Sequence, residues 1–261
     1  MEEVVLYVLA AAGLGVMWWR HGRHPAGSQG LELAEDAEIA LHLARHEARS
    51  RAKALAPVHL LYALLQDQAL AAAIRRAGGD VEAIEDAVFA ALDGAEREGE
   101  HAARHLLEWA VHAAHHGGRQ PTCADLFGGL TATRPAAAAL VEAGGVTAVQ
   151  VLFTLVHGVA DAPPAGASTG DGDEALIVLV NDHITTQEFV AELLRDVFGL
   201  SGDDATARML ETHTRGRGEV GRYRLEEARA RAETARRRAR ARGYPLWIRL
   251  EPANPGAPRS S

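Results

Sequence analysis

The sequence predicts a single N-terminal transmembrane helix, a mainly α double helical repeat, and a C-terminal α+β domain with a small antiparallel sheet packed on three helices. Three observations predict this. An apolar run opens the chain, a set of helical residues recurs 66 positions later, and the last third alternates apolar strands with amphipathic helices. The expected boundaries are 1–24 for the transmembrane anchor, 30–158 for the repeat domain, 159–174 for a flexible linker, 175–253 for the α+β domain and 254–261 for a disordered tail.

The first segment, from Val4 to Trp19, carries no charge and ends in two tryptophans. At ~1.5 Å per residue it spans ~24 Å, a little less than the ~30 Å hydrocarbon core of a bilayer. Two glutamates precede the run, and Arg20 and Arg23 follow it. This charge order predicts a single pass through the inner (cytoplasmic) membrane, with the remaining domains in the cytoplasm. The alternative is a buried N-terminal core helix.

Composition excludes several classes of function. The chain has 261 residues, a net charge of -8 and one cysteine, Cys123, so it forms no internal disulfide and no cysteine-based zinc site. Its mild acidity argues against nucleic acid as the partner of the whole chain. Lys53 is the only lysine and follows Ala52, so the Gly-Lys pair of a phosphate-binding loop is absent. We expect no cofactor.

The repeat domain begins with a helix whose inward face we expect to contain Ile39, Leu43 and Ala44. Pro57 starts the helix PVHLLYALL, the next helix ends at Gly78-Gly79, and DVEAIEDAVFAAL forms a fourth. The pattern then recurs. Matching segments are 43–44 and 109–110, Pro57 and Pro121-Thr122, 59–61 and 125–127, and 77–79 and 143–145. This predicts two packed copies of one helical unit.

These residues resemble the N-terminal repeat domain of Clp-type protein-unfolding ATPases. The resemblance rests on His59-Leu60-Leu61-Tyr62-Ala63-Leu64-Leu65 and on Gly78-Gly79-Asp80. In that family the domain binds adaptors and substrates and has no catalytic activity. Any ATPase served by this chain is therefore expected to be a separate protein.

Histidines recur in this part of the chain at a spacing that places two imidazoles on one helix face. The pairs are His42 with His46 and His101 with His105, and others stand at 112, 115 and 116. Such pairs can bind zinc. No acidic residue completes a known zinc motif, so we expect solvated surface histidines and no metal site.

The last part of the chain predicts the order strand, helix, helix, strand, helix, strand. A buried strand at 175–180 leads through a turn to a helix capped by Thr185 or Thr186. Ser201 opens the second helix, with Ala205, Met209 and Leu210 expected to face inward. A strand at 219–224, a long helix at 225–242 and a closing strand at 245–250 follow.

This segment resembles the ClpS family of adaptors. The matching residues are LIVLV followed by Asn181-Asp182-His183, Thr185 to Val190, VFGLS at 197–201, Ala205 to His213, Val220 to Tyr223, Pro245-Leu246 and Leu250 to Ala253. The family binds N-degrons, the exposed N-terminal residues that mark proteins for degradation, and delivers them to a Clp-type ATP-dependent protease. The resemblance implies a peptide-binding adaptor and not an enzyme.

The resemblance also implies site residues. Asn181, Asp182 and His213 would accept hydrogen bonds from the substrate's free amine, and His213 would do so through a ring nitrogen that carries no proton. The pocket for the first side chain would be formed by Thr185, Gln187, Val190, Met209, Thr212 and Leu246. Taken singly, these are ordinary turn, helix-end and core residues. His183, Ile184, Thr186, Gln187 and Thr212 depart from the family pattern and predict a more polar pocket with an altered preference.

By the same resemblance, Glu226 and Arg231 would dock the adaptor on the ATPase. A tether of ~15 residues reaches ~20 Å, so the two domains of this chain could also dock on each other. One rival interpretation is a membrane scaffold or regulator that docks Clp components without binding N-degrons. Another is nucleic-acid binding by the basic helix, whose nine arginines from 222 to 242 we expect to lie mostly on its solvated face.

Overall fold

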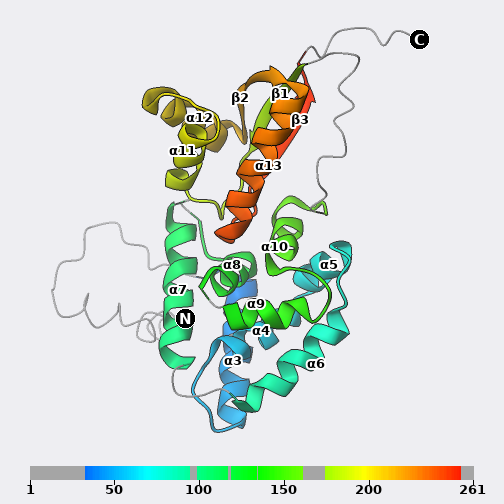
Figure 1. Ribbon diagram of the computed structural model, residues 1–261. Helices are drawn as coiled ribbons and strands as arrows, with labels where there is room; N and C mark the ends of the chain where they lie inside the picture. Colours follow the sequence, from blue (N-terminus) through cyan, green and yellow to red (C-terminus); the bar gives the residue numbers. More distant parts are fainter. Residues whose placement is uncertain (1–32, 95–98, 117–118, 134, 161–173, 254–261) are drawn as a thin grey trace, which may run out of the picture. The chain divides into compact units, whose positions relative to one another are not determined.

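The computed structural model describes residues 33–94, 99–116, 119–133, 135–160 and 174–253 (Figure 1). The chain divides into two compact units, Met1–Gly158 and Val159–Ser261. The predicted transmembrane segment, the tail at 254–261 and most of the linker lie outside the described residues. Within the described ranges, none of the helices is both long and apolar enough to cross a membrane.

The N-terminal unit is helical, as predicted, and its helices follow one order twice. The bounds are α3 Glu35–Ser50, α4 Pro57–Leu65, α5 Gln68–Arg76, α6 Val81–Ala91 with a 3-10 turn Leu92–Gly94, α7 Gly99–His116, α8 Cys123–Thr133, α9 Pro135–Glu142 and α10 Ala148–His157. Adding 66 to Pro57, the first residue of α4, gives Cys123, the first residue of α8, so Pro57 corresponds to Cys123 and not to Pro121-Thr122, which precede α8. The recurrence seen in the sequence therefore corresponds to two copies of a four-helix unit.

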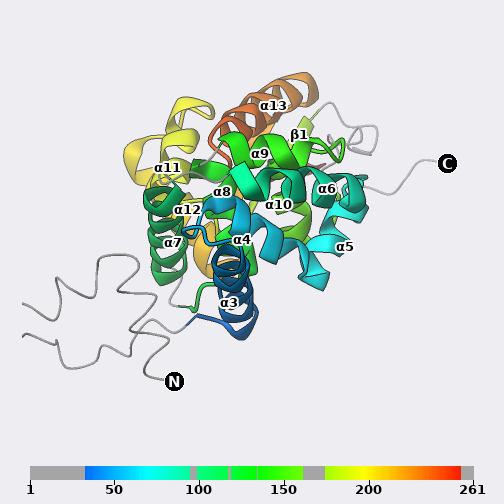
Figure 2. The ribbon, with the colours of Figure 1, turned by 90° about the horizontal axis from the view of Figure 1, so that it is seen from below.

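The two copies interlock through their last two helices. Helix α5 packs on α10, and α6 runs alongside α9 (Figures 1 and 2), so the third helix of each copy contacts the fourth of the other. The backbone N–H of Asp80 donates to the carbonyl of Gly144 at 3.0 Å. A Cβ on Gly144 would lie 2.6 Å from both the Asp80 carbonyl oxygen and Ile84 Cγ1. A close approach of the two copies therefore requires glycine at 144, whereas Gly78 and Gly145 have left-handed φ angles of 90° and 77° and open space around them.

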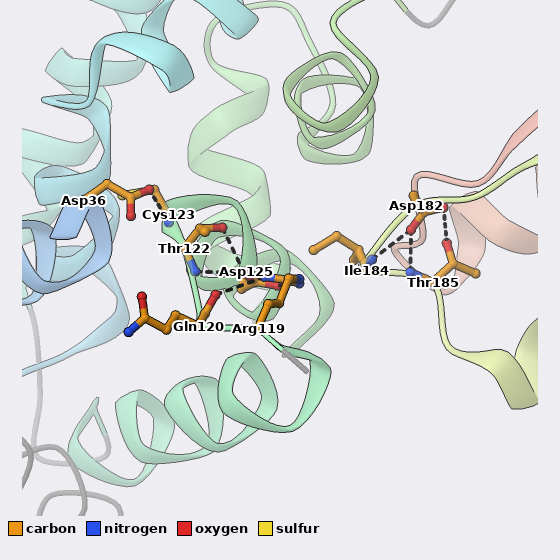
Figure 3. A network of polar contacts seen from close by, with 9 residues as sticks. All are labelled: Asp36, Arg119, Gln120, Thr122, Cys123, Asp125, Asp182, Ile184 and Thr185. Atoms are coloured by element: carbon orange, nitrogen blue, oxygen red, sulfur yellow. Dashed lines mark hydrogen bonds and ion pairs between the residues drawn. The ribbon is translucent and has the colours of Figure 1, made fainter. Parts of the chain in front are cut away.

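Helices α4 and α8 begin with the same backbone hydrogen bond, made by different side chains. The N–H of Ala56 donates to His59 Nδ1 at 3.0 Å, and the N–H of Thr122 donates to Asp125 Oδ2 at 2.8 Å. Both acceptors are fully buried and occupy the third position of their helix. The charge of Asp125 is met by two nitrogens of Arg119, each at 2.5 Å, and by the Thr122 hydroxyl at 2.9 Å (Figure 3).

The expected inward face of α3 was partly wrong. Ile39 is 61% exposed, whereas Ala40, Leu41 and Ala44 are buried. Successive residues of a helix are rotated by 100° about its axis. The buried side of α3 therefore contains Ala40, Leu41 and Ala44, and Ile39 lies outside it. Phe89 on α6 is also exposed, and its ring lies under the guanidinium of Arg51 at 5.0 Å.

The C-terminal unit has the predicted element order. The bounds are β1 Glu174–Val180, α11 Gln187–Asp196, α12 Gly202–Arg215, β2 Arg217–Arg224, α13 Leu225–Ala241 and β3 Trp247–Pro252. The three strands form an antiparallel sheet in the order β2-β1-β3, and α13 packs against all three (Figure 1). The prediction of a small antiparallel sheet with helices is confirmed.

The core of this unit lies between the sheet and the helices. Alternate residues of β1, namely Ala175, Ile177 and Leu179, are fully buried in it. Opposite them, α13 contributes four buried alanines, which are Ala228, Ala232, Ala235 and Ala239. The pairing register shifts between Ile177 and Val178, because Ile177 faces Gly221 while Val178 faces Glu219. The extra residue, Val220, is buried in the core.

One expectation for this unit was wrong. Leu210, expected to face inward on α12, is 47% exposed, while its neighbour Met209 packs against the core. The arginines of α13 lie mostly on its solvated face, as expected, but Arg236 is buried. It donates from Nη2 to the carbonyl oxygen of Ile248 at 2.7 Å, which ties α13 to β3.

The buried histidine of α4 predicts an acid sensitivity of the repeat domain. Burial lowers the pKa of His59 from its ordinary value of 6.5. The unfolded chain therefore binds a proton at a higher pH than the folded chain does, and the free energy of unfolding decreases as the pH falls below ~6.5. In His59→Gln the acceptor for the Ala56 N–H is kept but the titration is lost, so this part of the decrease disappears.

The measurement is urea unfolding of residues 30–158 at several pH values from 7.5 to 5, followed by the fluorescence of Trp109, the one tryptophan in that range. If the free energy of unfolding decreases equally with falling pH in the wild type and in His59→Gln, the assignment to His59 is contradicted.

Candidate functional site

The loop between β1 and α11, residues 181–186, is organised around one carboxylate. Asp182 Oδ1 accepts the backbone N–H groups of Ile184 at 2.9 Å and Thr185 at 2.6 Å, and Oδ2 accepts the Thr185 hydroxyl at 2.8 Å (Figure 3). The residue is only 7% exposed. Burial of a carboxylate is costly unless such hydrogen bonds replace its water, so the charge of Asp182 holds the loop in one shape.

Both ends of this loop are attached to neighbouring elements. The N–H of Asn181 donates to the carbonyl oxygen of Gly216 at 2.9 Å, directly after α12. At the other end, Thr186 caps α11 by accepting the N–H of Phe189 at 3.3 Å, and its hydroxyl lies 3.4 Å from that of Tyr244. Ile184, between them, is buried. The structure thus decides between the two candidate caps, since Thr185 bonds to Asp182 instead.

Helix α12 brings the distant histidine to this loop. Its N-cap is Ser201, as the sequence predicted, and it ends at Gly216, whose φ of 76° is left-handed and favours glycine. His213 is exposed and stands three residues before Gly216. The bond from Asn181 to Gly216 therefore joins the start of the loop to the end of the helix that carries His213.

The predicted pocket residues differ in burial. Val190 and Leu246 belong to the buried core, and Met209 packs against it, half-buried. Thr212 is 4% exposed and donates its hydroxyl to the carbonyl oxygen of Arg208 at 2.8 Å. A Cβ on Gly218 would overlap the Thr212 hydroxyl, so β2 can pass this close only as glycine. Gln187 is half-buried at the first position of α11.

Asp182 also stands out electrostatically. It is the one buried acidic side chain among the described residues of the C-terminal unit. Its hydrogen-bond donors are two backbone N–H groups and one hydroxyl, all of them uncharged. Its negative charge is therefore not neutralised by a cation among the described residues of the unit, and such a charge at low exposure attracts a cationic group.

The two predicted docking residues have different environments. Glu226 is 85% exposed at its side chain and pairs with its helix neighbour Arg229 at 3.1 Å. Arg231, in contrast, donates from Nε to Glu227 at 2.9 Å and from Nη1 to the carbonyl oxygen of Val197. Its guanidinium also lies 5.0 Å from the ring centre of Tyr223. These contacts link α13 to the end of α11, a structural role that the sequence pattern did not reveal.

Neither the histidines nor the cysteine forms a site in the described ranges. No group of three or more His, Cys, Asp or Glu side chains there could hold a metal ion. His105 lies 3.4 Å from Glu108, and the side chains of His101, His112, His115 and His116 are outside the description. Cys123 is buried, and burial raises the pKa of its thiol far above the ordinary value.

Comparison with known families matches both parts of the chain. Residues 172–249 match the family described as ATP-dependent Clp protease adaptor protein ClpS. Residues 32–143 match the Clp repeat (R) N-terminal domain. The two domains predicted from the sequence are therefore present in one chain.

Individual relatives give the same result for the C-terminal part. The ClpS adapter protein of Nitratidesulfovibrio vulgaris (strain DSM 19637 / Miyazaki F) is 44% identical over 75 residues, which cover 29% of this chain and 75% of that protein. That of Neisseria gonorrhoeae is 35% identical over 106 residues, 41% of this chain and 94% of that protein. Among solved structures, Agrobacterium tumefaciens ClpS2 bound to L-phenylalaninamide is 30% identical, with 31% of this chain and 96% of that chain covered and a TM-score of 0.30.

The matched family consists of adaptors that act on a protease without catalysing a reaction themselves, in agreement with the prediction that the chain is not an enzyme. Through its C-terminal unit, the chain belongs to the ClpS family of ATP-dependent Clp protease adaptors.

Proposed function

We propose that the chain is a membrane-tethered adaptor that binds the free N-terminal residue of a substrate protein and delivers that protein to a Clp-type ATP-dependent protease. The observation that carries the proposal is the backbone bond from Asn181 to Gly216, which brings the loop of Asp182 to the end of the helix of His213. The order of these residues within a ClpS match supports the same site.

In this proposal Asn181, Asp182 and His213 hold the substrate's α-amino group. That group has an ordinary pKa of ~7.7–8.0 and is mostly cationic at neutral pH. Asn181 and His213 offer an amide oxygen and a ring nitrogen as acceptors. Asp182 contributes a buried negative charge whose donors in the described part of the unit are all uncharged. An acetylated N-terminus lacks both the charge and the extra N–H groups, so it leaves these acceptors unsatisfied.

The first side chain of the substrate is proposed to bind beside the amine site against Thr185, Gln187, Val190, Met209, Thr212 and Leu246. Burial of a large apolar side chain there contributes ~1.5–3 kcal/mol. Thr212 adds little polarity, because its hydroxyl already donates within α12. The polar character of the pocket therefore depends chiefly on Gln187, and the preference among first residues is expected to differ from a purely apolar pocket.

The apolar segment at the N-terminus is proposed as a single-pass anchor in the inner (cytoplasmic) membrane, with both domains in the cytoplasm. The support is its charge-free length and the order of the flanking charges. Such an anchor would keep the adaptor, and any substrate bound to it, at the membrane surface.

The Clp repeat domain is proposed as a docking partner for adaptor domains, either within one chain or between neighbouring chains. Short flexible linkers give effective concentrations in the millimolar range. The docked state would therefore be populated even if the two domains bind each other weakly. Glu226 is proposed to contribute, because it is exposed and only weakly engaged. Arg231 contributes in this proposal through the surface it supports, since its guanidinium is held by Glu227, Val197 and Tyr223.

The first prediction concerns selectivity for a free amine. Residues 170–261 contain the whole ClpS match at 172–249 and lie within the second compact unit, so they are suited to isolated study. Labelled peptides that differ only in the first residue are expected to bind when free and not when N-acetylated, as measured by fluorescence anisotropy. Asn181→Ala and His213→Ala should each weaken binding by ~10-fold or more, the loss of one hydrogen bond to a charged group.

Thr206→Ala, an exposed change on α12, is the matched control and should bind like the wild type. Absence of binding to every free N-terminus would contradict the proposed function and favour a scaffold that docks Clp components.

The second prediction concerns the anchor. The full chain is expected to float with phospholipid vesicles in a density gradient and to resist extraction at high salt, because its attachment is hydrophobic. A chain that begins at residue 25 should remain in the dense fractions. Flotation of both proteins, or of neither, would show that residues 1–24 do not anchor the protein.

The third prediction concerns docking between domains. Fragments 30–158 and 170–261 are expected to bind each other in a calorimetric titration with a Kd of about 1 mM or lower, at which a millimolar effective concentration keeps about half or more of the tethered domains docked. Glu226→Lys should weaken this binding, whereas Glu219→Lys on β2, which makes the same charge change on a strand, should not. Equal effects of the two variants would mean that charge alone, and not the α13 surface, governs the association.

A further inference from the structure

Thr185 has contacts that differ from those of a pocket wall. Its backbone N–H and its hydroxyl both donate to Asp182, at 2.6 Å to Oδ1 and at 2.8 Å to Oδ2. One residue therefore binds both oxygens of the carboxylate, as the close-up of this loop shows (Figure 3). Thr185 is half-buried, and its hydroxyl is used in this bond.

Two donors on two oxygens restrict the carboxylate more than one donor does. A carboxyl group held at a single oxygen can still turn about the bond that joins it to Cβ, because that torsion is broad. Donors on both oxygens fix its plane. The N–H of Ile184 reinforces Oδ1 only, at 2.9 Å, so the Thr185 hydroxyl is the donor that sets the position of Oδ2.

Contacts on both sides of the Asp182–Thr185 pair hold the loop backbone in place. Asn181, directly before Asp182, is held to Gly216 by its own N–H, and Thr186, directly after Thr185, is held to α11 as its cap. The backbone is thus fixed on both sides of the Asp182–Thr185 pair. Within this frame, the direction of the buried charge depends on the Thr185 side chain.

We propose that Thr185 is a positioning residue of the amine site, which acts by orienting the Asp182 carboxylate, and is not a determinant of the preference for the substrate's first side chain. This inference rests on the proposed function. If Thr185 were part of the pocket wall, its substitution would change the ranking of first side chains. As a positioning residue, it affects the discrimination between free and acetylated N-termini and leaves that ranking unchanged.

Valine and serine test the two contributions of Thr185. Valine has nearly the shape of threonine but no hydroxyl, and serine keeps the hydroxyl without the methyl group. In residues 170–261, Thr185→Val is expected to weaken binding of free-amine peptides by about tenfold, which corresponds to one lost hydrogen bond to a charged group. Thr185→Ser should restore binding. The ranking of peptides that begin with Leu, Phe, Tyr or Trp should stay as in the wild type.

A double-mutant cycle tests whether Thr185 acts through Asp182. Asp182→Asn removes the charge that Thr185 orients, so adding Thr185→Val to it should cause no further loss of binding. Ser201→Ala serves as the stability control, because it removes the cap of α12 without touching the loop. Thermal unfolding of every variant is recorded, and Thr185→Ala replaces the valine variant if the latter does not fold.

The results separate the two levels of the proposal. Failure of the wild-type domain to bind any free N-terminus would overturn the proposed function together with this inference. If the wild type binds and Thr185→Val changes the ranking of first side chains while amine discrimination is unchanged, only the positioning role is overturned. An undiminished effect of Thr185→Val in the Asp182→Asn background would also overturn it.

Discussion

A buried carboxylate must have hydrogen bonds in place of its lost water, and at Asp182 this requirement determines the shape of the loop after β1. Its three donors all come from the next three residues, so the loop has to fold back on the side chain. The bond from Asn181 to Gly216 then attaches the folded loop to α12. The candidate site exists because these local bonds and this one tertiary bond are satisfied together.

The arginines of α13 hold the helices in place around this site. Arg242 makes two bonds of 3.0 Å to Glu192, and Arg238 pairs with Asp196 at 3.1 Å, both on α11. Exposed pairs of this kind contribute at most ~1 kcal/mol each, but buried Arg236 adds a bond from α13 to β3. Several arginines of this basic helix therefore serve contacts within the unit.

The repeat domain shows how one backbone requirement can be met by two kinds of side chain. Neutral His59 and charged Asp125 occupy equivalent positions and accept equivalent N–H groups. The charged version also needs a cation, which Arg119 supplies. Removal of that arginine would leave a buried charge unpaired, a loss of ~3–5 kcal/mol. The copies have therefore diverged in chemistry while the geometry of the helix start has stayed the same.

The sequence by itself determined the order of the elements, the duplication, and the families of both domains, because these depend on periodicity and on motifs of adjacent residues. It did not determine which side of a helix packs when several apolar residues compete, so Ile39 and Leu210 were placed on the wrong face. The sequence also assigned a docking role to Arg231 and a pocket role to Thr185 only because they occupy matching positions in the ClpS family pattern. The partners of Arg231, Val197 and Tyr223, are set by how the chain closes on itself. Thr185, in contrast, meets Asp182 three residues earlier in a local turn, and only the burial of that carboxylate depends on the rest of the fold. A one-residue step turns a helix by 100°, and a long arginine side chain can meet several neighbours, so only the tertiary structure decided which helix faces pack and which partners Arg231 has.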